Sequence, residues 1–145
     1  MKSHGKELRK GRYSCAGNYY HITTVTKDRE KSLANLHTAR ILIQSLRYAD
    51  EQGWATSLSF VVMPDHLHWL FELGEMKTLD KLVASVKRYS STRVSILEWQ
   101  EGFYDHGIRK DEDLKSVARY IVANPLRAGL VESITDYSHW DSIWM

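Results

Sequence analysis

Hydrophobic and polar residues alternate most regularly in the segment MPDHLHWLFEL, residues 63–73. Side chains on a strand point alternately to its two faces, so this alternation predicts a β-strand. His66 and His68 fall on one face, two residues apart. Two such imidazoles can reach one metal ion, although a single histidine is more commonly a hydrogen-bonded or surface residue. The other face carries only apolar side chains, namely Leu67, Trp69, Phe71 and Leu73.

Two strands are predicted before this one and a short pair after it. Residues 18–26 are rich in β-branched and aromatic side chains, which favour a strand. Residues 54–63 end in an almost wholly apolar run, as in a central strand covered on both faces. Pro64-Asp65 is a turn signal, so that strand and the histidine strand should form a hairpin. Residues 99–109 are typical of two short strands about a turn at Glu101-Gly102.

Apolar residues spaced by three or four positions predict three helices. The first begins at a cap, Ser32, and runs to about residue 52, and the second covers residues 78–94. The third begins after a cap at Asp111 and ends near Asn124, because Pro125 disfavours helix at the residue before it. The order of elements predicts an α+β fold, a mainly antiparallel sheet with helices packed on it in a ferredoxin-like sandwich.

Composition places these elements in one domain, residues 1–145. A chain of 145 residues with 43% hydrophobic content is long enough for a real core. The only cysteine, Cys15, excludes an internal disulfide and fits a reducing cytoplasm. Because no apolar run reaches about 18 residues, no membrane span is predicted. The charged N-terminus has no apolar segment after it, so no signal peptide is expected.

Positive charge is concentrated in two places, although the net charge is only +2. The N-terminal arm, residues 1–15, has five basic residues against one acidic residue in its first twelve, Lys10 and Arg12 among them. The polar face of the second helix carries Lys81, Lys87 and Arg88. Both groups are candidate phosphate contacts for a nucleic acid. A solvated charged surface is also ordinary for an arm or a helix, so both interpretations stay open.

The third helix holds a second informative pair. Tyr120 and Asn124 are four residues apart, so they lie one above the other at the border of the apolar stripe. Considered separately, Tyr120 is an aromatic side chain at the edge of the core, and Asn124 is a residue that ends a helix before proline. With His66 and His68 they suggest a nucleophile and a third metal ligand. A cation there would polarise a phosphodiester, and attack by the tyrosine would leave a phosphotyrosyl link and a free 3′-hydroxyl.

Four blocks of sequence carry a family resemblance. They are YYHITTVT, VVMPDHLHWLFEL, WQEGFYDHGIR and YIVANPLRAGLVE, in this order and spacing. With them the chain resembles the REP-associated tyrosine transposases, an IS200-like branch of the single-tyrosine HUH nuclease-transposases. The resemblance implies an HUH nuclease sandwich. It also implies a metal-dependent endonuclease that cleaves single-stranded DNA beside hairpins, forms a 5′-phosphotyrosine intermediate and rejoins strands.

The resemblance also implies a partner, a cofactor and residue roles. The implied partner is single-stranded DNA with hairpin structure, and the implied cofactor is Mg²⁺ or Mn²⁺. The protein itself is expected in the cytoplasm, associated with the nucleoid. His106 and Arg109, with Asp105, match a block expected near the DNA or the site. The active-site matches are His66 and His68 as the metal pair, Tyr120 as the nucleophile and Asn124 as the polar ligand.

Two rival functions and the oligomeric state stay open. One rival is a catalytically silent DNA-binding protein of the same fold. The other is a zinc hydrolase that uses His66, His68 and a carboxylate such as Glu72, although no general base is evident. Related transposases of insertion sequences work as homodimers that share the tyrosine helix, whereas a C-terminal tail favours a monomer in this branch. The tail here is short, residues 126–145, so neither assembly is excluded.

Overall fold

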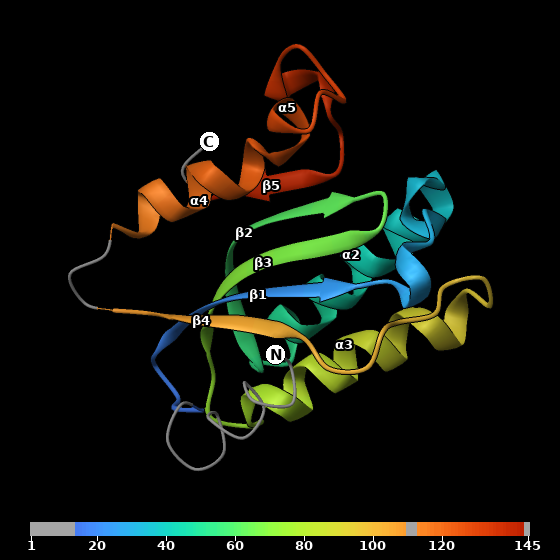
Figure 1. Ribbon diagram of the computed structural model, residues 1–145. Coiled ribbons are helices and arrows are strands. Elements are labelled where there is room, and N and C mark those ends of the chain that lie inside the picture. Colours follow the sequence, from blue (N-terminus) through green and yellow to red (C-terminus); the bar gives the residue numbers. More distant parts are fainter. Residues whose placement is uncertain (1–13, 110–112, 144–145) are drawn as a thin grey trace.

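The structure is a computed structural model, and it describes residues 14–109 and 113–143. Within these ranges five strands form one antiparallel sheet in the order β4-β1-β3-β2-β5, which places β3 in the middle (Figure 1). The strands are β1 Tyr19–Val25, β2 Ala55–Met63, β3 His66–Leu73, β4 Tyr104–Ile108 and β5 Trp140–Ser142. The predicted α+β fold with a mainly antiparallel sheet is confirmed.

Helices cover both faces of the sheet. Two long helices, α2 and α3, pack side by side on one face, and α4 with the short α5 lies on the other (Figure 1). Their bounds are α2 Leu36–Glu51, α3 Leu79–Arg93, α4 Leu114–Val122 and α5 Asn124–Arg127. Three single turns of 3₁₀ helix complete the described elements: η1 Lys27–Arg29, η2 Ser32–Ala34 and η3 Ile134–Asp136.

The alternation along β3 divides the core into two clusters. Trp69 and Phe71 are fully buried in the larger cluster, against α2 and α3. Leu70 points the other way and joins a smaller cluster with Ala118 and Ile121 of α4. Burying a large apolar side chain contributes about 1.5–3 kcal/mol, so both clusters hold helices to the sheet. The indole Nε1 of Trp69 donates a hydrogen bond to Ser57 Oγ at 2.8 Å, so its polar atom is satisfied within the core.

The first helix begins later than its sequence pattern predicts. Ser32 does not cap it but opens η2, and α2 starts at Leu36 with Asn35 as its N-cap. The Asn35 side chain accepts a hydrogen bond from the backbone N–H of Thr38 at 3.1 Å. Leu33 is fully buried, and its N–H donates to the Pro64 carbonyl at 3.0 Å. This contact with the β2–β3 turn holds the segment in a 3₁₀ turn, so the cap moves to Asn35.

The predicted strand pair in 99–109 forms only in part. Residues 104–108 form β4 on β1, whereas Trp99 makes only an isolated bridge to Thr26. Residues 100–103 instead run beside α3, where the ammonium of Lys87 donates to the carbonyls of Gln100 (2.9 Å) and Gly102. A charged donor with two carbonyl acceptors competes well with a two-residue ladder, so the first strand of the pair is lost.

The cap predicted for the third helix, Asp111, lies outside the described residues, and the N-cap of α4 is Asp113. Its carboxylate accepts hydrogen bonds from Lys115 N (3.0 Å) and Ser116 Oγ (2.8 Å). The helix ends at Val122, and Asn124 and Pro125 begin the short α5. Proline therefore interrupts the helix as predicted, but the chain turns directly into a second helical turn.

The segment after α5 packs back on the sheet as strand β5. β5 pairs with β2 at residues 59–61, and Val62 N donates to the His139 carbonyl at 2.8 Å. The half-buried hydroxyl of Tyr137 donates to the Val62 carbonyl at 2.6 Å. Both backbone polar groups of Val62 are thus bonded to the tail. In the part of the chain that is described, no helix has the length and apolar character needed to cross a membrane.

Tyr137→Phe should therefore lower the free energy of unfolding by about 1 kcal/mol, because it removes one hydrogen bond to a buried carbonyl. Urea denaturation followed by circular dichroism measures this change. Tyr104→Phe is the matched control, because Tyr104 is exposed on β4 and its loss of a hydroxyl should change stability little. Equal losses in the two variants would show that the Tyr137 contact does not hold the tail.

Candidate active site

His66 and His68 lie on the same face of β3, as the alternation predicts. Their ring centroids are 4.9 Å apart and their planes are nearly perpendicular. Across the sheet, His68 is opposite Thr23 of β1, and His66 is opposite Met63 of β2. Both histidines are half-buried, on the sheet face that α4 covers. The two rings are therefore held side by side by the sheet register.

Each of the two rings uses Nδ1 for a protein partner. His66 Nδ1 is 2.7 Å from Asp65 Oδ1, and because a carboxylate only accepts, we assign the proton to Nδ1. His68 Nδ1 is 3.0 Å from both His21 Nε2 and Thr23 Oγ1. This arrangement leaves Nε2 of both rings for a ligand. Histidines that bind metals are oriented in this way, with the second nitrogen bonded to a neighbouring protein group.

Burial favours the neutral form of two imidazoles, those of His68 and His21. Burial lowers the pKa of His68 to about 3, and positive charge on His21, His66 and Arg127 adds to the effect. Burial also lowers the pKa of His21 to about 4, with a further contribution from His106. At neutral pH these two rings are therefore unprotonated, and for His68 this is the state that binds a metal ion.

Asp65 is ionised beside them. Burial by itself raises its pKa, but the hydrogen bond from His66 and the charges of His66 and Arg29 outweigh burial, so the pKa lies below its usual value. The second carboxylate oxygen, Oδ2, accepts a hydrogen bond from Arg29 Nε at 3.1 Å. Sequence reasoning identified Asp65 only as a turn residue, and its contact with His66 makes it part of the site.

Tyr120 lies on α4, with its side chain 59% exposed. The guanidinium of Arg127 stacks on its ring, 3.6 Å from the centroid, and donates from Nη2 to the Tyr120 carbonyl at 2.7 Å. The same guanidinium is close enough to His68 to lower its pKa. Arg127 therefore contacts the tyrosine and adds positive charge to the surroundings of His68. Sequence reasoning had not named it as a candidate site residue.

Asn124 lies where α4 meets α5. Its amide nitrogen donates to the Ile121 carbonyl at 3.0 Å, which leaves the amide oxygen Oδ1 as the atom able to bind a cation. No described contact joins Asn124 to the histidine pair, so its role as a ligand stays a prediction. Across the described ranges, no group of three or more His, Cys, Asp or Glu side chains could hold a metal ion.

The ligand set of the zinc hydrolase is not brought together. Glu72 lies four residues beyond His68 on β3, which at the rise of a strand is about 13 Å along the chain. It is paired opposite Tyr19, toward the other end of the strand. A cation at the histidine pair would therefore need an oxygen ligand from a residue other than Glu72.

The sequence-predicted DNA contacts divide between the two faces of the sheet. His106 lies on β4 opposite His21, on the face of the histidine pair, and exposed Arg109 follows β4. Lys81, Lys87 and Arg88 lie on α3, which packs on the opposite face, so the sheet separates them from the site. Lys10 and Arg12 are outside the described residues. The structure thus brings His106 near the site and leaves the α3 cations away from it.

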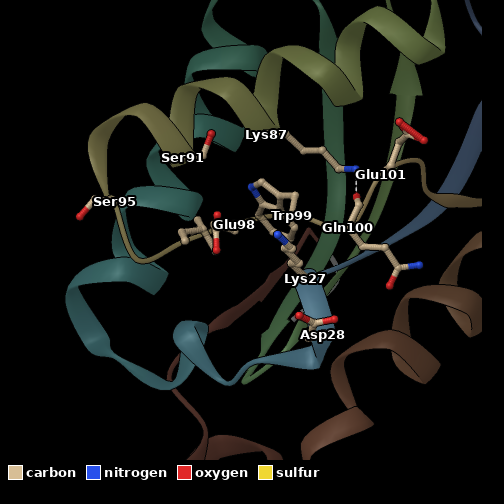
Figure 2. A pocket seen from close by; sticks show the side chains of 10 residues that line it. Lys27, Asp28, Lys87, Ser91, Ser95, Glu98, Trp99, Gln100 and Glu101 are labelled. Atoms are coloured by element: carbon tan, nitrogen blue, oxygen red, sulfur yellow. Dashed lines mark hydrogen bonds between the residues drawn. The ribbon is translucent and has the colours of Figure 1, made fainter.

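A hollow of about 800 Å³ lies between α3 and the segment 97–101 (Figure 2). Lys87 and Ser91 border it from α3, and Trp99 and Glu98 border it from the segment opposite (Figure 2). This hollow is on the α3 side of the sheet and holds no histidine. It is therefore distinct from the site built on β3.

Most of the chain matches the model of a known protein family. The family model described as IS200-like transposase matches residues 14–124. The chain belongs to the IS200-like transposase family. The match covers the histidine pair, Tyr120 and Asn124 in one continuous segment, and membership supports a DNA-processing enzyme.

Two curated relatives of this IS200-like transposase chain are REP-associated tyrosine transposases by name. The one from Haemophilus influenzae is 27% identical over 139 residues, covering 85% of this chain and 78% of its own. The one from Escherichia coli K12 is 25% identical over 133 residues, covering 87% of this chain and 77% of its own. The expected resemblance to REP-associated tyrosine transposases is confirmed.

A solved structure shows the same fold. It is a REP-associated tyrosine transposase bound to a REP hairpin, and it superposes with a TM-score of 0.76 at 22% identity. The superposition covers 89% of this chain and 79% of the other. The IS200-like fold, with helices on both faces of an antiparallel sheet, is therefore common to both proteins.

The buried neutral histidines predict a pH dependence of stability. Unfolding returns His21 and His68 to an ordinary pKa of 6.5, so the unfolded chain binds more protons between about pH 4 and 6.5. The free energy of unfolding should therefore fall as the pH is lowered through this window, by up to about 1.4 kcal/mol per pH unit for each histidine. Urea denaturation of the metal-free protein from about pH 7 to pH 5 measures the slope.

His21→Gln is the control for this slope. It removes one of the two rings at the site with a lowered pKa, so the loss of stability on acidification should become shallower. A wild-type stability that stays constant over the same range would mean that the rings are not held neutral by burial.

Proposed function

We propose that this chain is a metal-dependent endonuclease and transposase that cleaves and rejoins single-stranded DNA through a 5′-phosphotyrosine intermediate. One observation carries the proposal: two histidines on one face of β3 both use Nδ1 for protein partners, which leaves Nε2 of each ring for a cation. Family membership supports DNA as the substrate.

Tyr120 is the proposed nucleophile. Its phenolic oxygen forms a bond to phosphorus while the bond from phosphorus to the 3′ oxygen breaks. The tyrosine loses its proton, and the leaving oxygen gains one to become a free 3′-hydroxyl. The new phosphodiester conserves the energy of the broken bond, so a second 3′-hydroxyl can reverse the reaction and rejoin the strand. An exposed ring, as Tyr120 has, is reachable by a DNA backbone.

Mg²⁺ or Mn²⁺ is the proposed cofactor, held by Nε2 of His66 and His68 and by Oδ1 of Asn124. Two imidazoles and an amide oxygen form a mixed nitrogen and oxygen donor set, and water and phosphate oxygens would complete it with the hard donors that Mg²⁺ and Mn²⁺ prefer. Bound there, the cation would polarise a non-bridging phosphate oxygen. The chain itself supplies the orientation of both rings and, through Arg127, a positive charge beside the tyrosine.

The proposed partner is single-stranded DNA beside a hairpin. The solved relative with this fold is bound to a REP hairpin, and the curated relatives carry the same family name. His106 on the site face and the exposed Arg109 after β4 are proposed contacts to the strand. Because Arg127 packs on Tyr120 and its positive charge acts on His68 of the same chain, we infer a monomer whose site is complete in one chain.

Tyr120→Phe should abolish cleavage and the covalent protein–DNA adduct while DNA binding stays nearly intact. A phenyl ring has no atom that can attack phosphorus. Because the side chain is 59% exposed, the stability cost should be below about 1 kcal/mol. The assay incubates the protein with a labelled hairpin oligonucleotide and Mn²⁺, and detects adducts on denaturing gels and by mass spectrometry.

Two controls accompany this experiment. Tyr104→Phe should cleave normally. Tyr104, on β4, is a second tyrosine at the edge of the site face, so this variant controls for the loss of a tyrosine hydroxyl there. A mixture of inactive Tyr120→Phe and His66→Ala proteins should stay inactive if each site is complete in one chain, and would regain activity in shared-site dimers. A DNA fragment attached to any residue other than Tyr120 would contradict the assignment, and wild-type binding without cleavage would favour the silent DNA-binding protein.

Neutralising Lys81 and Arg88 together tests whether the α3 face contacts DNA. If both touch phosphates, the salt slope of single-strand binding should fall by about 1.4, since each contact contributes about 0.7. Fluorescence anisotropy at several salt concentrations measures it. Lys87 is left unchanged because it holds the carbonyls of Gln100 and Gly102. An unchanged slope would mean that this face is only solvated.

A further inference from the structure

The turn before β3 is attached to a short segment after β1, residues 26–30. The N–H of Thr26 donates to the Asp65 carbonyl at 3.0 Å. The Thr26 hydroxyl lies 2.6 Å from the Glu30 carbonyl and 3.1 Å from the Asp65 carbonyl, so its one proton is shared within this segment and turn. Arg29 Nε donates to Asp65 Oδ2 at 3.1 Å, while Asp65 Oδ1 accepts from His66 Nδ1 at 2.7 Å. One carboxylate thus joins an arginine on one side to a histidine of the site on the other.

The backbone of this segment is strained. Asp28 and Arg29 are consecutive residues with φ values of 56° and 54°, and they are the only described residues other than glycine in this region. Such a conformation is uncommon outside glycine, and arginine tolerates it less well than aspartate. Backbone strain of this kind clusters at functional sites, where the surrounding structure maintains it.

We propose that Arg29 and Asp65 are positioning residues that fix the tautomer and ring orientation of His66, so that Nε2 faces the cation. This inference rests on the proposed function of the histidine pair. The ion pair holds the carboxylate with Oδ1 toward His66, and the carboxylate keeps the imidazole proton on Nδ1. The strained turn is the backbone conformation that brings the Arg29 guanidinium to Asp65.

A simple surface ion pair does not account for this arrangement. Arg29 is 62% exposed, but the side chains of Asp65 and His66 are only 19% and 17% exposed. Exposed pairs contribute little to stability, whereas a carboxylate behind a metal-binding histidine changes metal affinity by about 10–100-fold. Loss of the ion pair is therefore expected to change the metal affinity and the tautomer of His66, and to leave the melting temperature nearly unchanged.

Arg29→Gly and Asp28→Gly form a matched pair of variants. Each places glycine at a position with positive φ, so each relieves strain and should keep or raise the melting temperature. Only Arg29→Gly removes the partner of Asp65. Arg29→Lys restores a positive charge without the planar guanidinium and should rescue in part. Asp65→Ala removes the carboxylate, and Asp65→Asn replaces it if the alanine variant fails to fold.

Two measurements on the full chain decide the inference. Nitrogen-15 NMR of the histidine side chains in the metal-free protein reports whether the His66 proton sits on Nδ1. Mn²⁺ titration followed by electron paramagnetic resonance reports the affinity of the site, with His68→Ala as the baseline. Asp28→Gly should match the wild type in both. Arg29→Gly should lose several-fold in Mn²⁺ affinity, and Asp65→Ala about 10–100-fold with a mixed His66 tautomer.

The outcomes separate the two proposals. If Arg29→Gly and the Asp65 variants keep the His66 tautomer and the Mn²⁺ affinity of Asp28→Gly, the positioning role is overturned while the metal site stands. If the wild type binds no more Mn²⁺ than His68→Ala, the proposed metal function fails. The tautomer measurement then still decides the positioning role, because a mixed tautomer in the Asp65 variants supports it and an unchanged one overturns it.

Discussion

β3 is hydrogen-bonded along its length to β1 on one side and to β2 on the other, and this double pairing determines which helices its side chains meet. Trp69 and Phe71 face α2 and α3, while the histidines face α4. A slip of one residue would exchange the two sets. It would place imidazoles in the larger apolar core and indole rings under α4. Register and apolar burial therefore reinforce each other, and the site position follows from both.

Half-buried imidazoles on a sheet face need hydrogen-bond partners, because a buried polar group without one is costly. The chain supplies them from neighbouring elements, Thr23 and His21 on β1 and Asp65 in the turn. These partners satisfy Nδ1 and at the same time orient Nε2. The contacts that stabilise the polar face thus also pre-organise it for a ligand.

Sequence reasoning succeeded where the pattern is local and repeated. The alternation in β3 placed both histidines on one face, and helical spacing located α2, α3 and α4. It failed where a distant group decides the local structure. Leu33, bonded to Pro64, displaced the cap predicted at Ser32, and Lys87 of α3 removed half of the hairpin predicted in 99–109. Such contacts depend on how the elements pack, which periodicity does not encode.

The same distinction holds for the residues of the candidate site. The histidine pair was visible as an i, i+2 spacing, and His21 with Thr23 repeats that spacing on β1, so pairing the two strands could have found them. Arg127 had no such signal, because its contact with Tyr120 depends on the turn between α4 and α5. Asp65 was visible only as a turn residue, since its strained partner segment lies more than thirty residues away.

The hairpin of β2 and β3 has a consequence for how the molecule folds. It joins neighbouring segments through a turn of two residues, whereas β5 meets β2 across about eighty residues. Closing a longer loop costs more chain entropy, so we expect the hairpin to form early and the pairing of β5 late. Asp65 and His66 would then meet in the first structure to appear, and Tyr120 would arrive with α4 among the last. The two halves of the site would be assembled at opposite ends of the folding reaction.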